Sequence, residues 1–371
     1  MPSILSRLLF CTLLAFAIPT HAGEAWPDPD WPRASIPAGP ALSAFESYAF
    51  PQRDDQSRKG VRTDAVVVIC DGQLIYERYA GPTRPETSHL VWSVSKSVMA
   101  SVLGVAYGEG RFRLDDPVAQ HYPPFREHPQ ITLRHLLNWS SGLAWEEDYE
   151  YAPLTSSVVA MLYTRGRADM AAFTAGFPQV AAPGRRFRYS SGDSNVLSAA
   201  LRQMVGAAYP DYPWTALFEP LGIRSAVWER DGSDTFVGSS YAYMTARDLA
   251  RIGLLMQRNG RWRDRQLLPR EWLQFVLTPF PHYRPQAEKP GEAVPGGQWW
   301  LNRALDGAPA PWPSAPDSTF AALGHWGQAL YVLPEEKLVI VRYADDRDAS
   351  YRHDTFLKLA RAAFVGMEPQ P

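Results

Sequence analysis

The hydrophobic and polar positions near both ends of the chain form the pattern of β-hairpins. The segment 64–81, DAVVVICDGQLIYERYAG, has two runs rich in β-branched and aromatic residues, joined by Asp71-Gly72. Asp-Gly between two such runs is a strong signal for a two-residue turn. The segment 328–345, QALYVLPEEKLVIVRYAD, repeats the arrangement with Pro334 to Lys337 as its turn. We therefore predict two hairpins, the second followed by a closing helix over about 354–364.

Between the hairpins the periodicity is mainly helical. Thr132 is placed to cap a helix whose leucines share one face and whose stop we place at Gly142. A second helix starts at the capping box Thr245-x-x-Asp248 and ends at Asn259-Gly260. A short helix is also expected in ALSAFESYAF, residues 41–50, after a proline-rich arm.

Strands at both ends with helices between them predict an α+β fold. We expect one antiparallel sheet, built from the N- and C-terminal segments and flanked by helices, with an inserted, mainly helical subdomain. The sheet subdomain is placed at about 23–111 and 244–371, and the helical one at about 112–243, with a cleft between them. The segment 279–316 holds nine of the 33 prolines, too many for core elements, so we expect a long ordered loop at the rim of a pocket.

The first 22 residues have the form of an export signal. Arg7 precedes the apolar run 8–18, and Thr20-His21-Ala22 offers small residues at the cleavage positions. The run is too short to span a bilayer comfortably, although an uncleaved anchor is the alternative. We expect a mature chain that begins at Gly23 and is exported, periplasmic or secreted. Cys11 would leave with the signal, so Cys70 would have no internal disulfide partner.

Composition narrows the classes of function. The 371 residues are 46% hydrophobic and 20% charged with a net charge of −2, as in an ordinary globular protein, and they suggest neither nucleic acid nor an anionic membrane as a partner. The eight histidines lack metal-ligand spacing, and no glycine-rich phosphate loop occurs in the sequence. We therefore expect a small-molecule substrate and no cofactor.

One lysine is placed where a charge would be costly. In VWSVSKSVMASVLGVAYGEG, residues 91–110, Lys96 follows Ser93 by three positions at the start of an apolar helix. Residues three apart share a helix face, so Ser93 and Lys96 can meet, whereas Ser95 points elsewhere. The helix N-terminus and the apolar surroundings both favour the neutral amine, which can accept the serine proton. The alternative for a bare Ser-x-x-Lys is a capping serine followed by a lysine that extends to solvent.

Several further blocks occur in order, and together they carry a resemblance. Ser-x-x-Lys is followed by ITLRHLLNWSSGL (131–143), FRYSSGDSNVLSAAL (187–201), MTARDLARIGLLMQRNGRW (244–262) and GHWGQALYVLPEEKLVIVR (324–342). Over about residues 60–365 the chain resembles the serine β-lactamase and penicillin-binding-protein superfamily, and most of all its class C-like esterase and 6-aminohexanoate-dimer hydrolase branch.

The resemblance implies roles for specific residues. Ser93 would be the nucleophile, Lys96 its partner amine, and Tyr189, from the family's Tyr-x-Asn motif, would pass a proton to the leaving group. Ser191 stands where that motif has asparagine. The family's Lys-Thr-Gly motif falls on the three residues His325, Trp326 and Gly327, and the backbone N–H of Gln328 would pair with that of Ser93 as oxyanion donors.

The departures from the family pattern bear on the substrate. His325 replaces a lysine that helps to hold a substrate carboxylate, so a fixed positive charge is lost, and Trp326 adds an apolar wall. Asp193 we expect to cap the helix that follows it. We therefore predict a serine hydrolase for small esters or linear amides. The alternatives are a periplasmic β-lactamase or DD-peptidase, a transacylase, and a non-catalytic ligand-binding protein on the same fold.

Overall fold

The computed structural model describes residues 24–285 and 291–366. Its centre is a seven-stranded antiparallel sheet in the order β2-β1-β12-β11-β10-β9-β8. The strands are β1 (Thr63–Cys70), β2 (Gln73–Tyr79), β8 (Val294–Pro295), β9 (Trp300–Leu301), β10 (Phe320–Gly324), β11 (Gln328–Leu333) and β12 (Leu338–Ala344). The predicted sheet, built from both ends of the chain, is thus present.

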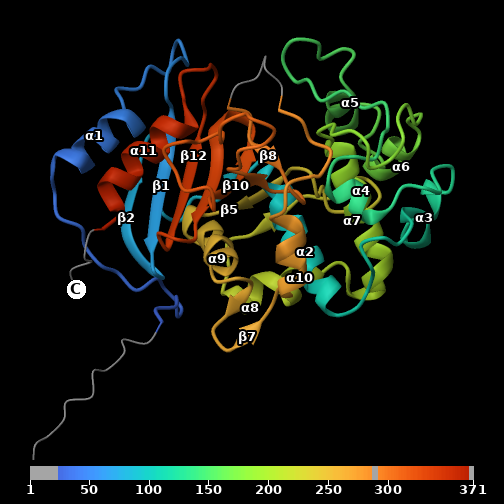
Figure 1. Ribbon diagram of the computed structural model, residues 1–371, viewed down its shortest axis with the longest axis horizontal. Helices are drawn as coiled ribbons and strands as arrows, with labels where there is room; N and C mark the ends of the chain where they lie inside the picture. The colour runs from blue at the N-terminus through green and yellow to red at the C-terminus, as the bar shows by residue number, and fades with distance from the viewer. Residues whose placement is uncertain (1–23, 286–290, 367–371) are drawn as a thin grey trace, which may run out of the picture.

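Alternation of side chains along the strands explains why helices cover both faces. Val66 and Val68 of β1 pack on one side with α1 (Pro40–Ala49) and α11 (His353–Phe364). Val67 and Ile69 face the other side, where α2 (Val94–Gly108) and α9 (Ala246–Gln257) lie. Figure 1 shows α1 and α11 together on the outer face of the sheet.

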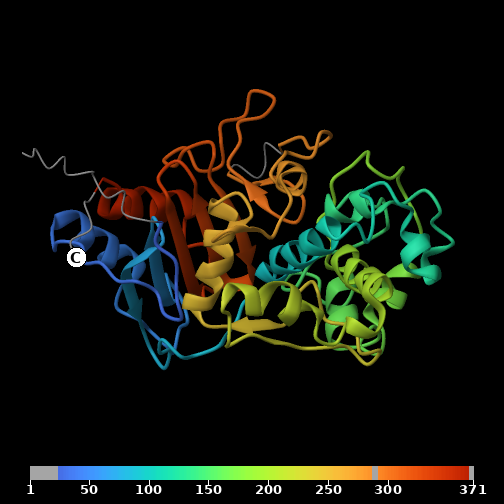
Figure 2. The same cartoon turned by 90° about the horizontal axis from the view of Figure 1, so that it is seen from below.

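The remaining helices gather at the far end of the molecule, beyond α2. They are α3 (Val118–His121), α4 (Leu133–Leu137), α5 (Ser157–Tyr163), α6 (Met170–Ala175) and α7 (Ser191–Val205), with α8 (Glu219–Leu221) and α10 (Arg270–Val276) nearer the sheet. Figures 1 and 2 both show α2 between the sheet and this green helical group. The subdomain boundaries near 111 and 243 stay predictions.

Smaller elements complete the chain. β3 (His89–Leu90), β4 (Val227–Trp228) and β5 (Ala242–Met244) form a three-stranded sheet, and β6 (Arg261–Trp262) pairs with β7 (Arg265–Gln266). Two short 3₁₀ segments are η1 (Pro123–Phe125) and η2 (Gly206–Ala208), and η3 (Trp214–Phe218) is a short π-helix. The segment η4 (His325–Gly327) is a turn in which Trp326 is not helical.

Local signals in the sequence predict several boundaries correctly. Asp71 and Gly72 both have positive φ, 45° and 83°, as the two-residue turn between β1 and β2 requires. The Thr245 hydroxyl accepts the backbone N–H of Asp248 at the start of α9, and Thr132 forms a capping box with His135 at α4. These side chains satisfy N–H groups that a helix start leaves unpaired.

Two expectations need correction. Ser190, and not Asp193, caps α7, because its hydroxyl accepts the Asp193 backbone N–H and the helix already begins at Ser191. The segment 279–316 is not simply a loop, because β8 and β9 lie within it at the sheet edge, where Pro295 is tolerated.

Residues 286–290 of that segment and the predicted export signal lie outside the described residues. Among the residues that are described, no helix is long and apolar enough to cross a bilayer.

Candidate active site

The start of α2 presents Ser93 and Lys96 to each other. Ser93 directly precedes the helix with φ −67° and ψ −7°, so its backbone is already helical. The Lys96 backbone N–H donates to the Ser93 carbonyl at 3.0 Å, which places both side chains on one face. Lys96 Nζ lies 3.0 Å from Ser93 Oγ, and the lysine side chain is 1% exposed. The sequence-predicted pair therefore meets in the structure.

Lys96 is held by two further oxygens. Its Nζ donates to the Ser191 hydroxyl and to the Ser239 backbone carbonyl, each at 2.9 Å. Burial lowers the lysine pKa to about 8, because the charged amine is deprived of water, while the nearby Glu147 carboxylate opposes that shift. With this pKa, about one tenth of the amine is neutral at pH 7.

Tyr189 lies over the lysine, directly ahead of α7. Lys96 Nζ is 4.9 Å from the centre of the Tyr189 ring, and the ring packs against Trp139 and Trp300 at centroid distances of 4.9 and 5.5 Å. Burial raises the Tyr189 pKa above its usual value, and the Glu147 charge adds to this, while a hydrogen bond with Ser93 opposes it. Tyr189 is therefore a protonated phenol beside the Ser93 and Lys96 side chains.

A cavity of about 420 Å³ opens above Ser93 and Tyr189. Most of its wall is aromatic or apolar, with contributions from Tyr149, Trp300, Trp312, Ala293 and Leu323. Besides two tyrosines, its ionisable lining groups are the carboxylates of Glu147 and Glu292 and the imidazoles of His325 and His353. Burial lowers the pKa of both histidines, that of His353 to about 4, so both rings are neutral at pH 7. The cavity thus offers an apolar surface next to Ser93.

The turn from β10 to β11 forms one rim of this cavity. His325 lines it, and its ring packs at a tilt against Tyr149, with 4.9 Å between ring centres. Its Nε2 lies 3.6 Å from Glu150. Trp326 and Gly327 have positive φ, 58° and 87°. Gln328 opens β11 and is 1% exposed, with its side-chain amide bonded to Ala344. Of the four turn residues 325–328, His325 alone is among the described residues that line the cavity.

A buried ion pair supports that turn from below. The Arg342 guanidinium, with no exposed surface, donates to both Asp346 carboxylate oxygens, at 2.6 and 3.1 Å, and to the Gly327 carbonyl at 3.0 Å. The Asp346 backbone N–H donates to the Trp326 carbonyl at 3.1 Å. Bidentate contacts of this kind fix geometry, so the backbone ahead of Gln328 has little freedom.

Comparison with known proteins agrees with this arrangement. Residues 47–363 match the sequence profile described as Beta-lactamase. The chain belongs to the Beta-lactamase family. The 6-aminohexanoate-dimer hydrolase of Paenarthrobacter ureafaciens is 26% identical to it over 332 residues, which are 85% of this chain and 82% of the relative.

Two further relatives of this Beta-lactamase-family chain carry esterase or hydrolase names. Esterase EstB of Burkholderia gladioli is 27% identical over 194 residues, 46% of this chain and 48% of the esterase. The solved structure of EstCE1, a hydrolase with promiscuous acyltransferase activity, shares the fold with a TM-score of 0.66 at 17% identity, over 87% of this chain and 98% of that one. The chain is a hydrolase of this family, with the β-lactamase/transpeptidase fold.

The active site also contains a carboxylate, that of Glu147, which the sequence analysis does not single out. Glu147 accepts the Ser191 hydroxyl at 2.5 Å on Oε1, and the Ser191 backbone N–H at 2.9 Å and the Trp145 indole N–H at 2.5 Å on Oε2. It stands in the acidic run 146–150, which is typical of a solvated loop. Its contact with Ser191 spans 44 positions and leaves no local signal.

Ser191 lies beneath the site and not on its surface. It has no exposed area and is not among the described residues that line the cavity. Its hydroxyl instead lies between Lys96 Nζ and Glu147 Oε1. The residue that replaces the family's asparagine thus contacts the lysine, as part of a buried chain of polar groups.

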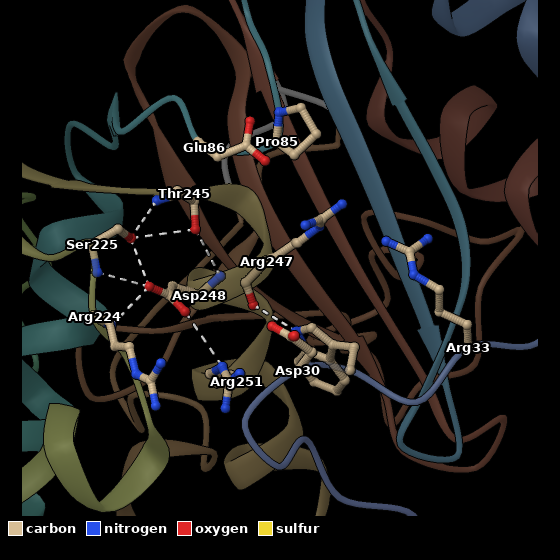
Figure 3. Close-up of a pocket in the computed structure, with 11 residues that line it drawn as sticks. Asp30, Arg33, Pro85, Glu86, Arg224, Ser225, Thr245, Arg247, Asp248 and Arg251 are labelled. Carbon is tan, nitrogen blue, oxygen red and sulfur yellow. Dashed lines mark hydrogen bonds and ion pairs between the residues drawn. The ribbon is translucent and has the colours of Figure 1, made fainter.

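A second hollow, also of about 420 Å³, lies elsewhere on the molecule (Figure 3). Several of its charged side chains are paired within the protein. Asp248 accepts the Ser225 hydroxyl and the backbone N–H groups of Arg224 and Ser225, and it pairs with Arg251 at 3.3 Å. Arg247 is paired with Glu77. We interpret this network as structural.

Among the described residues, no cluster of three or more His, Cys, Asp or Glu side chains is arranged to hold a metal ion.

Proposed function

We propose that this protein hydrolyses small esters or linear amides through an acyl-enzyme on Ser93. The observation that carries the proposal is the 3.0 Å approach of the buried Lys96 amine to the Ser93 hydroxyl at the floor of an apolar cavity. A nucleophile, a base within hydrogen-bond reach and a group that orients the base are the parts that covalent catalysis requires.

In the acylation step, the neutral Lys96 amine takes the Ser93 proton while Oγ attacks the substrate carbonyl carbon. The negative charge on the carbonyl oxygen is received by the backbone N–H groups of Ser93 and Gln328. As the tetrahedral intermediate collapses, Tyr189 gives its proton to the leaving alcohol or amine and recovers one from Lys96. The result is an ester between Ser93 and the acyl group.

In the deacylation step, a water molecule attacks the acyl carbonyl. The neutral Lys96 amine accepts its proton, with the Tyr189 hydroxyl passing the proton along, and the proton is then returned to Ser93 Oγ, which releases the carboxylic acid and restores the free enzyme. This chemistry uses only the side chains and backbone N–H groups named, with water as the second reactant.

The cavity favours substrates without an acidic group near the reacting carbonyl. Apart from two tyrosines, the ionisable groups that line it are two carboxylates and two histidines, and the pKa values of both histidines are lowered. Among the described lining residues, the cavity therefore offers a substrate carboxylate no fixed cation. The aromatic wall suits an apolar acyl or alcohol portion. We therefore rank short esters and linear amides above β-lactams and peptidoglycan stem peptides.

A substrate panel on the purified protein tests the proposal. It contains p-nitrophenyl esters of increasing chain length, linear amides, and nitrocefin, with Ser93→Ala as the control. Turnover of esters or amides that the control lacks, with nitrocefin turned over far more slowly, is the expected result. Faster turnover of nitrocefin, or no turnover of any member, would overturn the assignment.

We also propose that the chain is exported, on the basis of its first 22 residues. Fractionation of cells that express the full chain tests this. N-terminal sequencing of the mature protein should begin at Gly23, and recovery of an intact N-terminus from the cytoplasm would contradict the proposal.

A further inference from the structure

Three oxygen atoms surround the Lys96 amine. Whether each oxygen can donate or only accept a hydrogen bond determines how the amine is oriented. A neutral amine has two hydrogens and one lone pair. The Ser239 backbone carbonyl, 2.9 Å away, can only accept, so it takes one hydrogen. The remaining partners, Ser191 Oγ and Ser93 Oγ, are hydroxyls and could in principle either donate or accept.

Glu147 resolves that choice. Its carboxylate can only accept, and its Oε1 is 2.5 Å from Ser191 Oγ, so the Ser191 hydrogen points at Glu147 and away from the lysine. Ser191 Oγ can then act toward Lys96 only as an acceptor, and it takes the second amine hydrogen. The single place left for the amine lone pair is Ser93 Oγ, 3.0 Å away.

The structure assigns Glu147 a positioning role that acts through Ser191: it aims the lone pair of Lys96 at the hydroxyl of the nucleophile. This inference rests on the proposed function, because it concerns the base of that reaction. Glu147 itself is held by the Trp145 indole N–H at 2.5 Å and the Ser191 backbone N–H at 2.9 Å, so its direction does not depend on a substrate.

The same geometry predicts an electrostatic effect. The Glu147 charge favours the protonated form of Lys96, which burial disfavours. Other titratable groups near this pair, among the described residues, include Tyr149, two positions after Glu147, and Tyr189 and Asp193 at the start of α7. His325, His353 and Glu292 lie on the wall of the same cavity. Asp193 needs its own control, because burial raises its pKa to about 8, in the same range as that of Lys96.

The test uses Glu147→Gln, which removes the charge and can turn an N–H toward Ser191. The hydroxyl of Ser191 would then donate to Lys96 and occupy its lone pair. We expect kcat to fall by about 100-fold with little change in KM, a size typical of a mispositioned general base. We also expect the acid limb of the profile of log kcat/KM against pH to move to lower pH by about one unit. The loss of the neighbouring negative charge lowers the pKa of Lys96. A purely structural role for Glu147 would not move that limb.

A matched control lies next to it in the chain. Glu146 is a surface residue whose carboxylate, 68% exposed, pairs with Arg188 at 3.0 Å. Glu146→Gln should leave both kcat and the acid limb of the pH profile unchanged.

A second control addresses Asp193. Asp193→Asn should also leave the acid limb of the pH profile at the same pH. A limb that disappears in Asp193→Asn would assign the titration to Asp193 and overturn the electrostatic part of the inference.

The rate at which a fluorophosphonate labels Ser93, followed against pH, reports the base without the deacylation step. If wild-type protein is not labelled, the proposed function fails. If it is labelled and Glu147→Gln behaves like Glu146→Gln, this inference alone fails. If Glu147→Gln does not fold, as judged by circular dichroism, Ser191→Ala takes its place. This variant removes the hydroxyl that links Glu147 to Lys96 and keeps the Glu147 carboxylate. An unchanged labelling rate in the folded variant would equally overturn the inference.

Discussion

Lys96 Nζ and Ser93 Oγ lie 3.0 Å apart, with the lysine 1% exposed at the base of an aromatic cavity. In this setting the amine can lose its proton, whereas a guanidinium cannot. We expect Lys96→Arg to keep the charge and lower kcat/KM for a p-nitrophenyl ester by about 1,000-fold. Lys337→Arg is the control, because Lys337 forms an exposed ion pair with Asp71 and should retain wild-type activity. Activity in Lys96→Arg near that of the control would mean that Lys96 is not the base.

The pH dependence of the reaction follows from the same lysine. Its pKa is lowered to about 8, so the neutral, reactive fraction falls tenfold for each pH unit below that value. We expect log kcat/KM for an uncharged ester to rise with a slope of one up to about pH 8 and then to level off. Tyr189, with a pKa raised above its usual range, should add no fall on the alkaline side within the stable range of the protein. A profile that is flat between pH 6 and 9 would contradict the assignment of the base.

By the family resemblance, His325 is predicted to stand in place of a lysine that would hold a substrate carboxylate. Its pKa is lowered by burial, so it carries no charge at pH 7. Replacing it by lysine should raise kcat/KM for nitrocefin by about tenfold, the value of one favourable contact of roughly 1.4 kcal/mol, and should leave p-nitrophenyl acetate unaffected. Glu150, 3.6 Å from His325, would pair with the new lysine, so His325→Lys/Glu150→Gln should give the larger gain. An equal change for both substrates in both variants would show that charge at this position does not select the substrate.

Local features of the sequence predict much of the fold. Asp71-Gly72 and the Thr245 cap act within a few residues, so the hairpin and the start of α9 are visible in the sequence. Ser93 and Lys96 are visible for the same reason, because three residues of a helix bring them together. The placement of Tyr189 beside them depended on the family resemblance, since 93 positions separate it from Lys96.

Features that depend on distant contacts could not be predicted. The sequence around Glu147 is typical of an acidic loop. The role of Glu147 depends on its contacts with Ser191 and Trp145, and only the folded chain brings these residues together. Asp193 carries the residue type of a helix cap, yet the neighbouring Ser190 takes that place and Asp193 is buried within the first turn. Prolines suggested a loop at 279–316 because the sequence does not reveal that Pro295 lies on an edge strand.

The turn ahead of Gln328 should be sensitive to one added methyl group. Gly327 has φ 87°, and a Cβ there would lie 2.2 Å from Asp346 Oδ2 and 2.5 Å from an Arg342 nitrogen. We expect Gly327→Ala to lower the free energy of unfolding by at least about 2 kcal/mol, from the backbone strain and the displaced ion pair. Urea unfolding measures this loss. Gly366→Ala, a positive-φ glycine with nothing within 4 Å, isolates the backbone contribution, and an equal loss in both variants would show that the ion pair does not constrain the turn.

The account depends above all on Ser93 as the residue that becomes acylated. Mass spectrometry of the protein after reaction with a fluorophosphonate probe tests this directly, with Ser93→Ala and Ser95→Ala compared side by side. We expect one adduct, on the peptide that contains Ser93, in wild type and in Ser95→Ala, and both labelling and ester hydrolysis to be lost in Ser93→Ala. An adduct on another residue, or hydrolysis that persists in Ser93→Ala, would contradict the account.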